Sequence, residues 1–191
     1  LILSKAHSTT LEPVIDKPHC LPYNAFLKKH YQNCINQNAF EPMPVLLSTF
    51  QEHALWQKVL NHHFQEEVES SFVEVIQKNW KIGQKWCIPI EDGSFSYTKD
   101  TQLFQQLQKA FQKALNALPA ITLDQVVDYL VPQIKPGFVS QIYWAAFNEF
   151  SPQQKKLQAY LHALGIEQFH YDVFEHAELL YHTELTPALF S

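Results

Sequence analysis

A strongly signalled helix lies between two short apolar runs near the C-terminal end of the sequence. Residues 139–147 form an aromatic-rich, largely apolar run that predicts a buried strand, and residues 169–174 predict a second strand. Between them, residues 151–154 (SPQQ) combine an N-cap serine, a proline at N1 and a glutamine at N3, and Gly165 suits the C′ position. A strand, helix and strand within about 35 residues place the two strands parallel in one sheet.

The pattern is mainly helical upstream of residue 136. Apolar residues recur at helical spacing over 23–37 and 64–80, and residues 81–99 predict a loop or hairpin. Three more helices are opened by cap residues: Ser48, Asp100 or Thr101, and Thr122.

Two parallel strands are too small a sheet to stand alone, so further strands are expected from Leu1–Leu3, from the tail or from sequence beyond this chain. The predicted fold class is α/β but predominantly α-helical. It comprises a helical region over 1–135 and a strand–helix–strand unit of a small parallel sheet over 136–191. The two regions can pack as one compact unit.

The basic residues narrow the range of functions. The sequence has 14 lysines and no arginine, and its net charge is −5. An arginine finger for phosphoryl transfer and an arginine fork for guanine are therefore excluded within the chain. The four glycines form neither a GxGxxG nor a GxxxxGK[ST] loop, so neither phosphate-binding motif is present. An acidic chain without arginine is also an unfavourable general nucleic-acid binder.

The cysteines and the hydropathy indicate a cytoplasmic protein. Cys20, Cys34 and Cys87 are widely spaced and form no CxxC pair, which fits a reducing compartment. No apolar run reaches the roughly 18 residues of a membrane span, and the N-terminal residues lack the pattern of a signal peptide. We therefore expect no membrane partner. Because the chain lacks an initiator methionine, we also expect a segment of a longer protein.

One cluster combines basic and aromatic side chains. Lys78, Lys81 and Lys85 alternate with Trp80 and Trp86, a composition suited to single-stranded nucleic acid, with lysines on phosphates and rings stacked on bases. In the alternative interpretation the tryptophans belong to the core and the lysines are solvated. The acidic total charge favours this second interpretation.

Metal and nucleophile patterns are incomplete. His170, Asp172 and His176 are weak metal candidates, because two of them share a strand face but further ligands are not identifiable. His30 and Cys34 lie four residues apart on a helix like a base and a nucleophile, but the cysteine is better explained as a small core residue. No cofactor is therefore expected. A solvated helix face best explains a group of acids: Glu66, Glu67, Glu69 and Glu74.

Residues 142–154 (IYWAAFNEFSPQQ) resemble the Walker B region of UvrD-like helicases, where an apolar strand runs into an Asp-Glu pair before a helix start. This chain has Ala145 and Ala146 at the acidic pair, and alanine neither holds Mg²⁺ nor positions water. The stretch is most similar to an AddB-like group of bacterial proteins called probable DNA repair proteins. In that group a glycine stands in the place of Ala146, and a (D/N)E pair corresponds to Asn148 and Glu149. Segments 21–27, 47–56 and 104–130 resemble the same group in the same order.

The resemblance implies a non-catalytic, helicase-like segment of a DNA repair or recombination protein. Residues 20–135 would match the helical insertion of such helicases, and residues 136–175 part of their nucleotide-binding-like core. The segment would scaffold a nuclease domain of the same parent chain or a helicase partner subunit, and would guide single-stranded DNA. It would not be an enzyme by itself, since the Walker A lysine is absent and the Walker B acids are alanines.

Two alternatives remain open. One is an α-rich protein–protein interaction module without nucleic-acid binding, favoured by the absent arginine and the acidic charge. The other is a small hydrolase with a His/Asp or Cys/His site, for which no constellation is complete.

Overall fold

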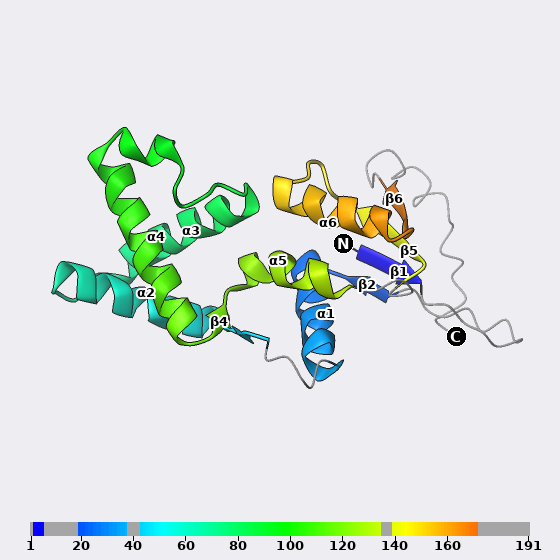
Figure 1. Cartoon of the computed structure of the whole chain (residues 1–191), viewed down its shortest axis with the longest axis horizontal. Helices are drawn as coiled ribbons and strands as arrows, with labels where there is room; N and C mark the ends of the chain where they lie inside the picture. The colour runs from blue at the N-terminus through cyan, green and yellow to red at the C-terminus, as the bar shows by residue number, and fades with distance from the viewer. Residues whose placement is uncertain (1, 6–18, 38–42, 135–138, 172–191) are drawn as a thin grey trace, which may run out of the picture.

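The computed structural model describes residues 2–5, 19–37, 43–134 and 139–171, and the structural statements below concern these ranges. They form two lobes (Figure 1). The helical lobe consists of α2 (Thr49–Phe64), α3 (Ser70–Lys85) and α4 (Lys99–Ala117). The helices of the sheet lobe are α1 (Tyr23–Gln37), α5 (Val126–Leu130) and α6 (Pro152–Ala163). Three short 3₁₀ helices complete the helical elements: η1 (Gly93–Ser96), η2 (Leu123–Gln125) and η3 (Val131–Gln133).

The sheet lobe is built on a four-stranded sheet with the order β2-β1-β5-β6. Its strands are β1 (Ile2–Lys5), β2 (His19–Leu21), β5 (Gln141–Ala145) and β6 (Glu167–Tyr171). β5 and β6 are parallel and joined by α6, which confirms the predicted strand–helix–strand unit. β1 supplies the expected additional strand, but it runs antiparallel to both β2 and β5. The predicted fold class, α/β and predominantly α-helical, is confirmed, and the added strands make the sheet mixed.

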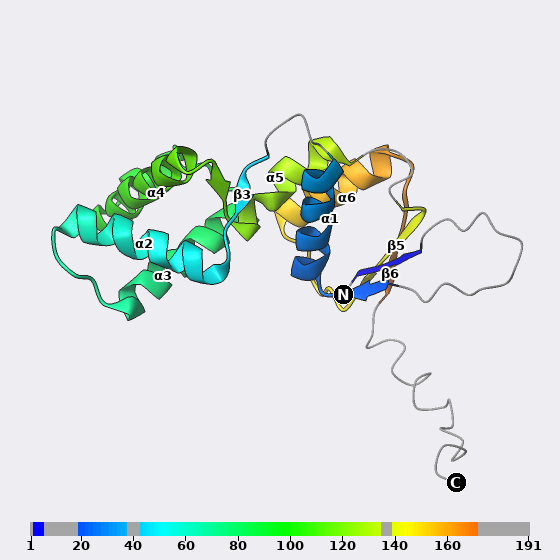
Figure 2. The ribbon, with the colours of Figure 1, turned by 90° about the horizontal axis from the view of Figure 1, so that it is seen from below.

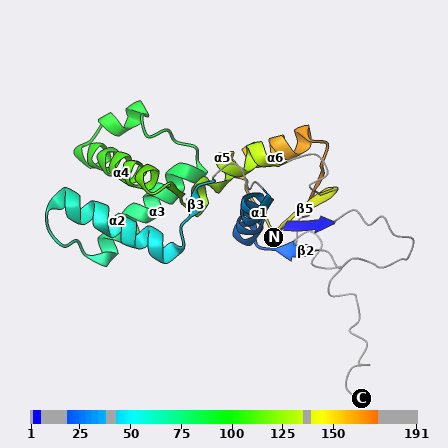
Figure 3. The ribbon, with the colours of Figure 1, turned by 60° about the horizontal axis from the view of Figure 1, so that its bottom comes forward.

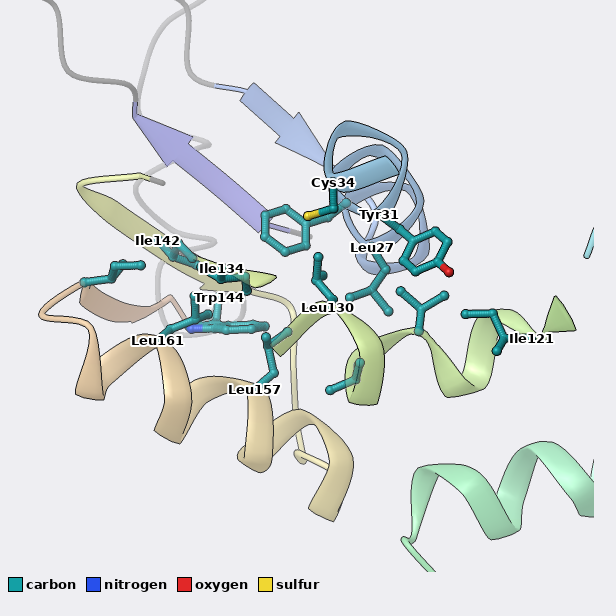
Figure 4. Close-up of a cluster of buried hydrophobic side chains, with 14 residues drawn as sticks. Leu27, Tyr31, Cys34, Ile121, Leu130, Ile134, Ile142, Trp144, Leu157 and Leu161 are labelled. Carbon is teal, nitrogen blue, oxygen red and sulfur yellow. The ribbon is translucent and has the colours of Figure 1, made fainter. Parts of the chain in front are cut away.

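The core of the sheet lobe lies between the sheet, α1, α5 and α6 (Figure 4). Ile142 and Trp144 are two residues apart on β5, so both side chains point into this core, where they contact Leu157 and Leu161 of α6. The indole Nε1 of Trp144 donates a hydrogen bond of 2.9 Å to Oε1 of Gln168. Alternation with period two thus buries one face of β5, as expected for a strand against a helix layer.

The core of the helical lobe is packed around aromatic rings. The ring of Trp56 on α2 stacks on Phe111 of α4, with centroids 3.8 Å apart and planes 6° from parallel. Trp80 of α3 meets both rings edge-on, at 5.9 Å from Trp56 and 5.3 Å from Phe111. All three side chains are fully buried, so the three helices close around a single cluster (Figure 2).

A short parallel pair, β3 (Val45–Leu46) and β4 (Ala120–Ile121), connects the lobes (Figure 3). Leu46 and Ile121 contribute to the core of the sheet lobe, whereas Leu47 and Ala120 contribute to the core of the helical lobe. The chain thus enters the helical lobe at β3 and leaves it at β4. The predicted boundary at residue 135 does not match this division, because α1, α5 and the N-terminal strands pack with β5 and α6.

Helix starts in the helical lobe follow their caps. The capping box at Ser48 is confirmed: its Oγ accepts from the amide of Gln51, and its own amide donates to Gln51 Oε1. α4 is capped by Thr98, whose Oγ1 accepts a hydrogen bond of 3.1 Å from the amide of Thr101, so the predicted caps Asp100 and Thr101 are wrong. Thr101 instead supplies the N3 side chain of that box.

The second helix of this lobe is shifted from its prediction. α2 continues to Phe64, and Gln65 then takes a left-handed backbone with φ of 58° that ends it. α3 accordingly runs from Ser70 to Lys85 instead of over 64–80, and the predicted loop over 81–99 begins only after Lys85.

Within the described ranges, no helix has both the length and the hydropathy needed to cross a lipid bilayer.

Candidate functional site

A cavity of about 250 Å³ lies where the two lobes meet. The C-terminal end of α3 contacts η2 and α6 at this junction. Two features predicted separately from sequence come together here, since Lys85 ends α3, Trp86 follows it, and Glu149 follows β5. The remaining wall comes from η2, from the first turn of α1 and from the first turn of α6: Tyr23, Asn24, Leu27, Leu123, Asp124, Phe150, Ser151, Gln153 and Gln154.

The start of α6 is held rigidly against this cavity. Ser151 Oγ accepts a hydrogen bond of 3.3 Å from the amide of Gln154, and Gln154 Oε1 accepts one of 2.8 Å from the amide of Ser151. The buried side chain of Gln153 donates through Nε2 to the backbone oxygen of Asp124. The predicted capping box at Ser151 is therefore confirmed, and the adjacent glutamine connects α6 to η2.

Charged groups of both signs surround the cavity. Burial raises the pKa of Asp124, and the nearby Lys81 and Lys85 act in the opposite direction. Burial, and then the negative charge of Asp124, raise the pKa of Tyr23 far above its ordinary value. The hydroxyl of Tyr23 has no hydrogen-bond partner among the described residues. The cavity thus combines a neutral phenol, a lysine and two carboxyl groups, a set that gives a phosphate only weak attraction.

The predicted basic-aromatic cluster is divided by the structure. Trp80 is fully buried against Trp56 and Phe111, so the prediction that it stacks on a base is wrong. Trp86 has 57% of its surface exposed beside the exposed Lys85. The apolar spacing of Val73, Ile76 and Trp80 on α3 indicates this division, because Trp86 lies beyond the end of that helix.

The lysines of the cluster also differ from one another. Lys81 Nζ lies 3.8 Å from Glu52 Oε1, and the Glu52 side chain is 4% exposed. Lys78 is exposed on α3 and does not line the cavity. Of the three, Lys85 alone is placed both at the cavity and in solvent.

The Walker B-like stretch places its four residues differently. Ala145 is buried at the end of β5, whereas Ala146 and Asn148 are exposed. Glu149 is exposed and lines the cavity. Ala146 has φ of 61°, a left-handed backbone that costs an L-residue about 1–2 kcal/mol and that glycine adopts freely. A glycine stands at this position in the AddB-like pattern.

The metal candidates lie only in part within the described residues, and the nucleophile pair lies on α1. His170 is exposed on β6, its ring edge-on to Phe150 at 5.1 Å, and Asp172 and His176 lie outside the described residues. No group of three or more His, Cys, Asp or Glu side chains placed to hold a metal occurs in the part of the chain that the structure describes. His30 and Cys34 are both buried in the core side of α1, which fits the packing interpretation.

The polar cavity residues Tyr23, Asn24 and Asp124 were not predicted from sequence as site residues. They come from two segments about a hundred residues apart. Each belongs to a helix start, and a helix start by itself indicates local structure, not a site. Only the packing of α1 against η2 brings them beside Lys85 and Glu149.

Comparison of this chain with protein-family models, with curated proteins and with solved structures gave no match. The AddB-like resemblance therefore remains a hypothesis based on the residues quoted above.

Proposed function

We propose that this chain is a non-catalytic, helicase-like segment of a bacterial, cytoplasmic DNA repair or recombination protein. It scaffolds a nuclease region of the parent protein or a partner subunit, and it guides single-stranded DNA. The end of β5 is the observation that carries this proposal. There Ala145 is buried and Ala146 has a left-handed backbone. By the resemblance to UvrD-like helicases, these two alanines stand where a helicase motor needs its two acids.

The cavity at the lobe junction supports the DNA-guiding role. The exposed indole of Trp86 offers a face for one base, and the adjacent Lys85 offers one phosphate contact. In parallel α/β sheets, ligands bind outside the carboxyl ends of the strands, and Glu149 and Phe150 lie at the carboxyl end of β5. Because Asp124 and Glu149 also line the cavity, binding is expected to be weak and sensitive to salt.

A second candidate function is an interaction module without nucleic-acid binding. The ion pair between Lys81 and Glu52 favours it, since that pair removes one of the three clustered lysines from contact with phosphate. The net charge of −5 acts in the same direction.

Fluorescence anisotropy with a labelled oligothymidylate at low salt distinguishes the two candidates. We expect Trp86→Ala to weaken binding by about 1–3 kcal/mol, the contribution of one stacked base. We expect Lys85→Ala to reduce the slope of the logarithm of the binding constant against the logarithm of salt concentration by about one unit. Tyr97→Ala and Lys99→Ala are matched controls, because both residues are exposed and lie outside the cavity.

Two results would contradict the proposal in different ways. Absence of binding at low salt, or equal losses in the control variants, would remove the DNA-guiding role and favour the interaction module. ATP hydrolysis by the purified chain, abolished by a single substitution in it, would disprove the non-catalytic role. Lys81→Ala is unsuitable as a test, because it leaves the buried carboxylate of Glu52 without its cation.

A further inference from the structure

A second hollow, of about 470 Å³, lies along α2 and the β3–β4 pair and shares no lining residue with the lobe-junction cavity. Its apolar walls are open to solvent: Phe50 is 81% exposed, Val45 59% and Leu118 54%. Surface residues of this size are common one at a time, but here three of them border one groove together with the half-buried Leu47 and Leu55. Such a grouped apolar surface is typical of an interaction site.

The groove follows the axis of α2. Phe50, Ala54 and Lys58 are spaced by four residues and form one row on this helix. At a rise of 1.5 Å per residue the row is about 12 Å long. The opposite side of α2 buries Trp56 and Leu60 in the helical-lobe core, so α2 carries a second apolar surface that no described residue covers.

The shape of the groove favours a helix as its occupant. The row on α2 forms a ridge of the kind that packs into the groove of a second helix, and Val45 and Ala120, partners in register in the β3–β4 pair, complete the wall. In the row on α2, the small side chain of Ala54 lies between Phe50 and Lys58 and allows a second helix to approach closely.

The charge of the groove indicates the chemistry of that helix. Lys58 is its one charged lining residue, it forms no ion pair with a described residue, and no acidic side chain lines the groove. One lysine on an apolar surface is insufficient for nucleic acid, which requires several phosphate contacts. An acidic side chain flanking an apolar stripe is complementary to Lys58.

We propose that this groove binds the apolar face of an acidic amphipathic helix from a partner protein. Phe50 inserts between the side chains of that helix, Ala54 allows close approach, and Lys58 pairs with an acid at its flank. This interaction surface is independent of the single-stranded DNA contact, because it shares no residue with the cavity at the lobe junction.

The test uses two labelled synthetic helices of about 15 residues, with leucines at i, i+3, i+4 and i+7 and with either glutamate or lysine at the remaining positions. Fluorescence anisotropy should show binding of the acidic helix and at least about tenfold weaker binding of the basic one. Phe50→Ala should weaken the acidic helix by at least about tenfold, and Lys58→Glu should reverse the preference between the two peptides.

The control is Tyr97→Ala, since Tyr97 is 84% exposed but lies outside the groove. Circular dichroism should show that each variant keeps its helices. Equal binding of both peptides, binding of neither, or an unchanged affinity in Phe50→Ala would overturn the proposal. Sedimentation that shows a dimer abolished by Phe50→Ala would overturn it as well, because the occupant would then be a second copy. These results are independent of oligothymidylate binding, so failure of this proposal would leave the DNA-guiding role untouched.

Discussion

The two lobes are assembled from the chain in different ways. The helical lobe uses one continuous stretch, from Thr49 to Ala117, whereas the sheet lobe combines residues 2–5 and 19–37 with residues 121–134 and 139–171. In the sheet lobe Ile2 is aligned with Trp144, so its assembly closes a loop of nearly the whole described chain. Long-range pairing of this kind carries a loop-closure cost that local helix packing avoids. The helical lobe is therefore specified by contacts within one stretch, and the sheet lobe by contacts between the two ends of the described chain.

The two cores also differ in how they satisfy polar groups. In the sheet lobe, the indole nitrogen of Trp144 is hydrogen-bonded to Gln168. In the helical lobe, the indole nitrogens of Trp56 and Trp80 are buried and have no hydrogen-bond partner among the described residues. A buried donor without a partner costs about 1–3 kcal/mol, so the helical lobe is stabilised by its rings more than by its polar contacts.

Removal of a buried tryptophan should give the largest effect in either lobe. Trp144→Ala and Trp56→Ala should each lower the free energy of unfolding by about 3–5 kcal/mol. The loss should be greater for Trp144, because its truncation also breaks a hydrogen bond. Denaturant titration followed by far-ultraviolet circular dichroism measures both. The exposed Trp86→Ala is the control and should change stability by less than about 1 kcal/mol. A greater loss in Trp56→Ala would reverse the proposed difference between the cores.

Two buried groups, His30 in the sheet lobe and Glu52 in the helical lobe, should respond to pH with opposite signs. Burial on α1, and then the charge of Lys29, lower the pKa of His30 to about 4 from its ordinary 6.5. The unfolded state therefore binds a proton first as the pH falls from 6.5 to 4, and this group should remove up to about 3 kcal/mol of stability. In the helical lobe burial raises the pKa of Glu52, although Gln77 and Lys81 oppose it. The folded state takes this proton first, so that contribution increases stability as the pH falls.

Denaturant titrations between pH 7 and pH 4 test this opposition. In His30→Asn, the free energy of unfolding should fall less as the pH falls. In Glu52→Gln it should fall more, because the carboxyl group whose protonation favours the folded state is absent. At pH 7, Glu52→Gln should be at least as stable as the parent, since it avoids burying a charge. If the free energy of unfolding changed with pH in the same way in both variants, His30 and Glu52 would not have the opposite effects proposed here.

The smallest of these effects should come from the helix caps, one in each lobe. Ser48 caps α2 and Ser151 caps α6, each in a reciprocal capping box. Ser48→Ala and Ser151→Ala should each cost about 1 kcal/mol. Because the cores are separate clusters, hydrogen exchange should show the loss of protection mainly in the lobe of the substitution. A uniform loss across both lobes would show that they unfold as one unit.

Much of the local structure could be predicted from the sequence. The capping boxes at Ser48 and Ser151, the helix over residues 23–37, and the parallel strands on either side of α6 all agree with the structure. The predictions are wrong at helix ends where neighbouring residues are each suited to begin the helix. Thr98 caps α4 instead of Asp100 or Thr101, and the first residues of the helix predicted over 64–80 belong to the end of α2 and the turn after it. Adjacent cap residues are close in energy, so the packing of the turn decides between them.

The candidate site was predictable only in part. The sequence indicated Lys85, Trp86 and Glu149 separately, and no spacing joins them, because α3 and the end of β5 are more than fifty residues apart. It could not indicate that Asp124 and Tyr23 share their cavity, since each was explained by a local turn.

By itself, the sequence determined the helices, their caps and the strand–helix–strand unit. These depend on hydrogen bonds and side-chain periodicity within a few residues of one another. It also determined that this chain has no arginine and no GxxxxGK[ST] loop. The tertiary structure alone decided that β1 runs antiparallel to β5, that the lobes divide at β3 and β4, and that Trp80 is buried while Trp86 is exposed. Those outcomes depend on contacts between residues far apart in the chain, whose energies appear only when the lobes are packed.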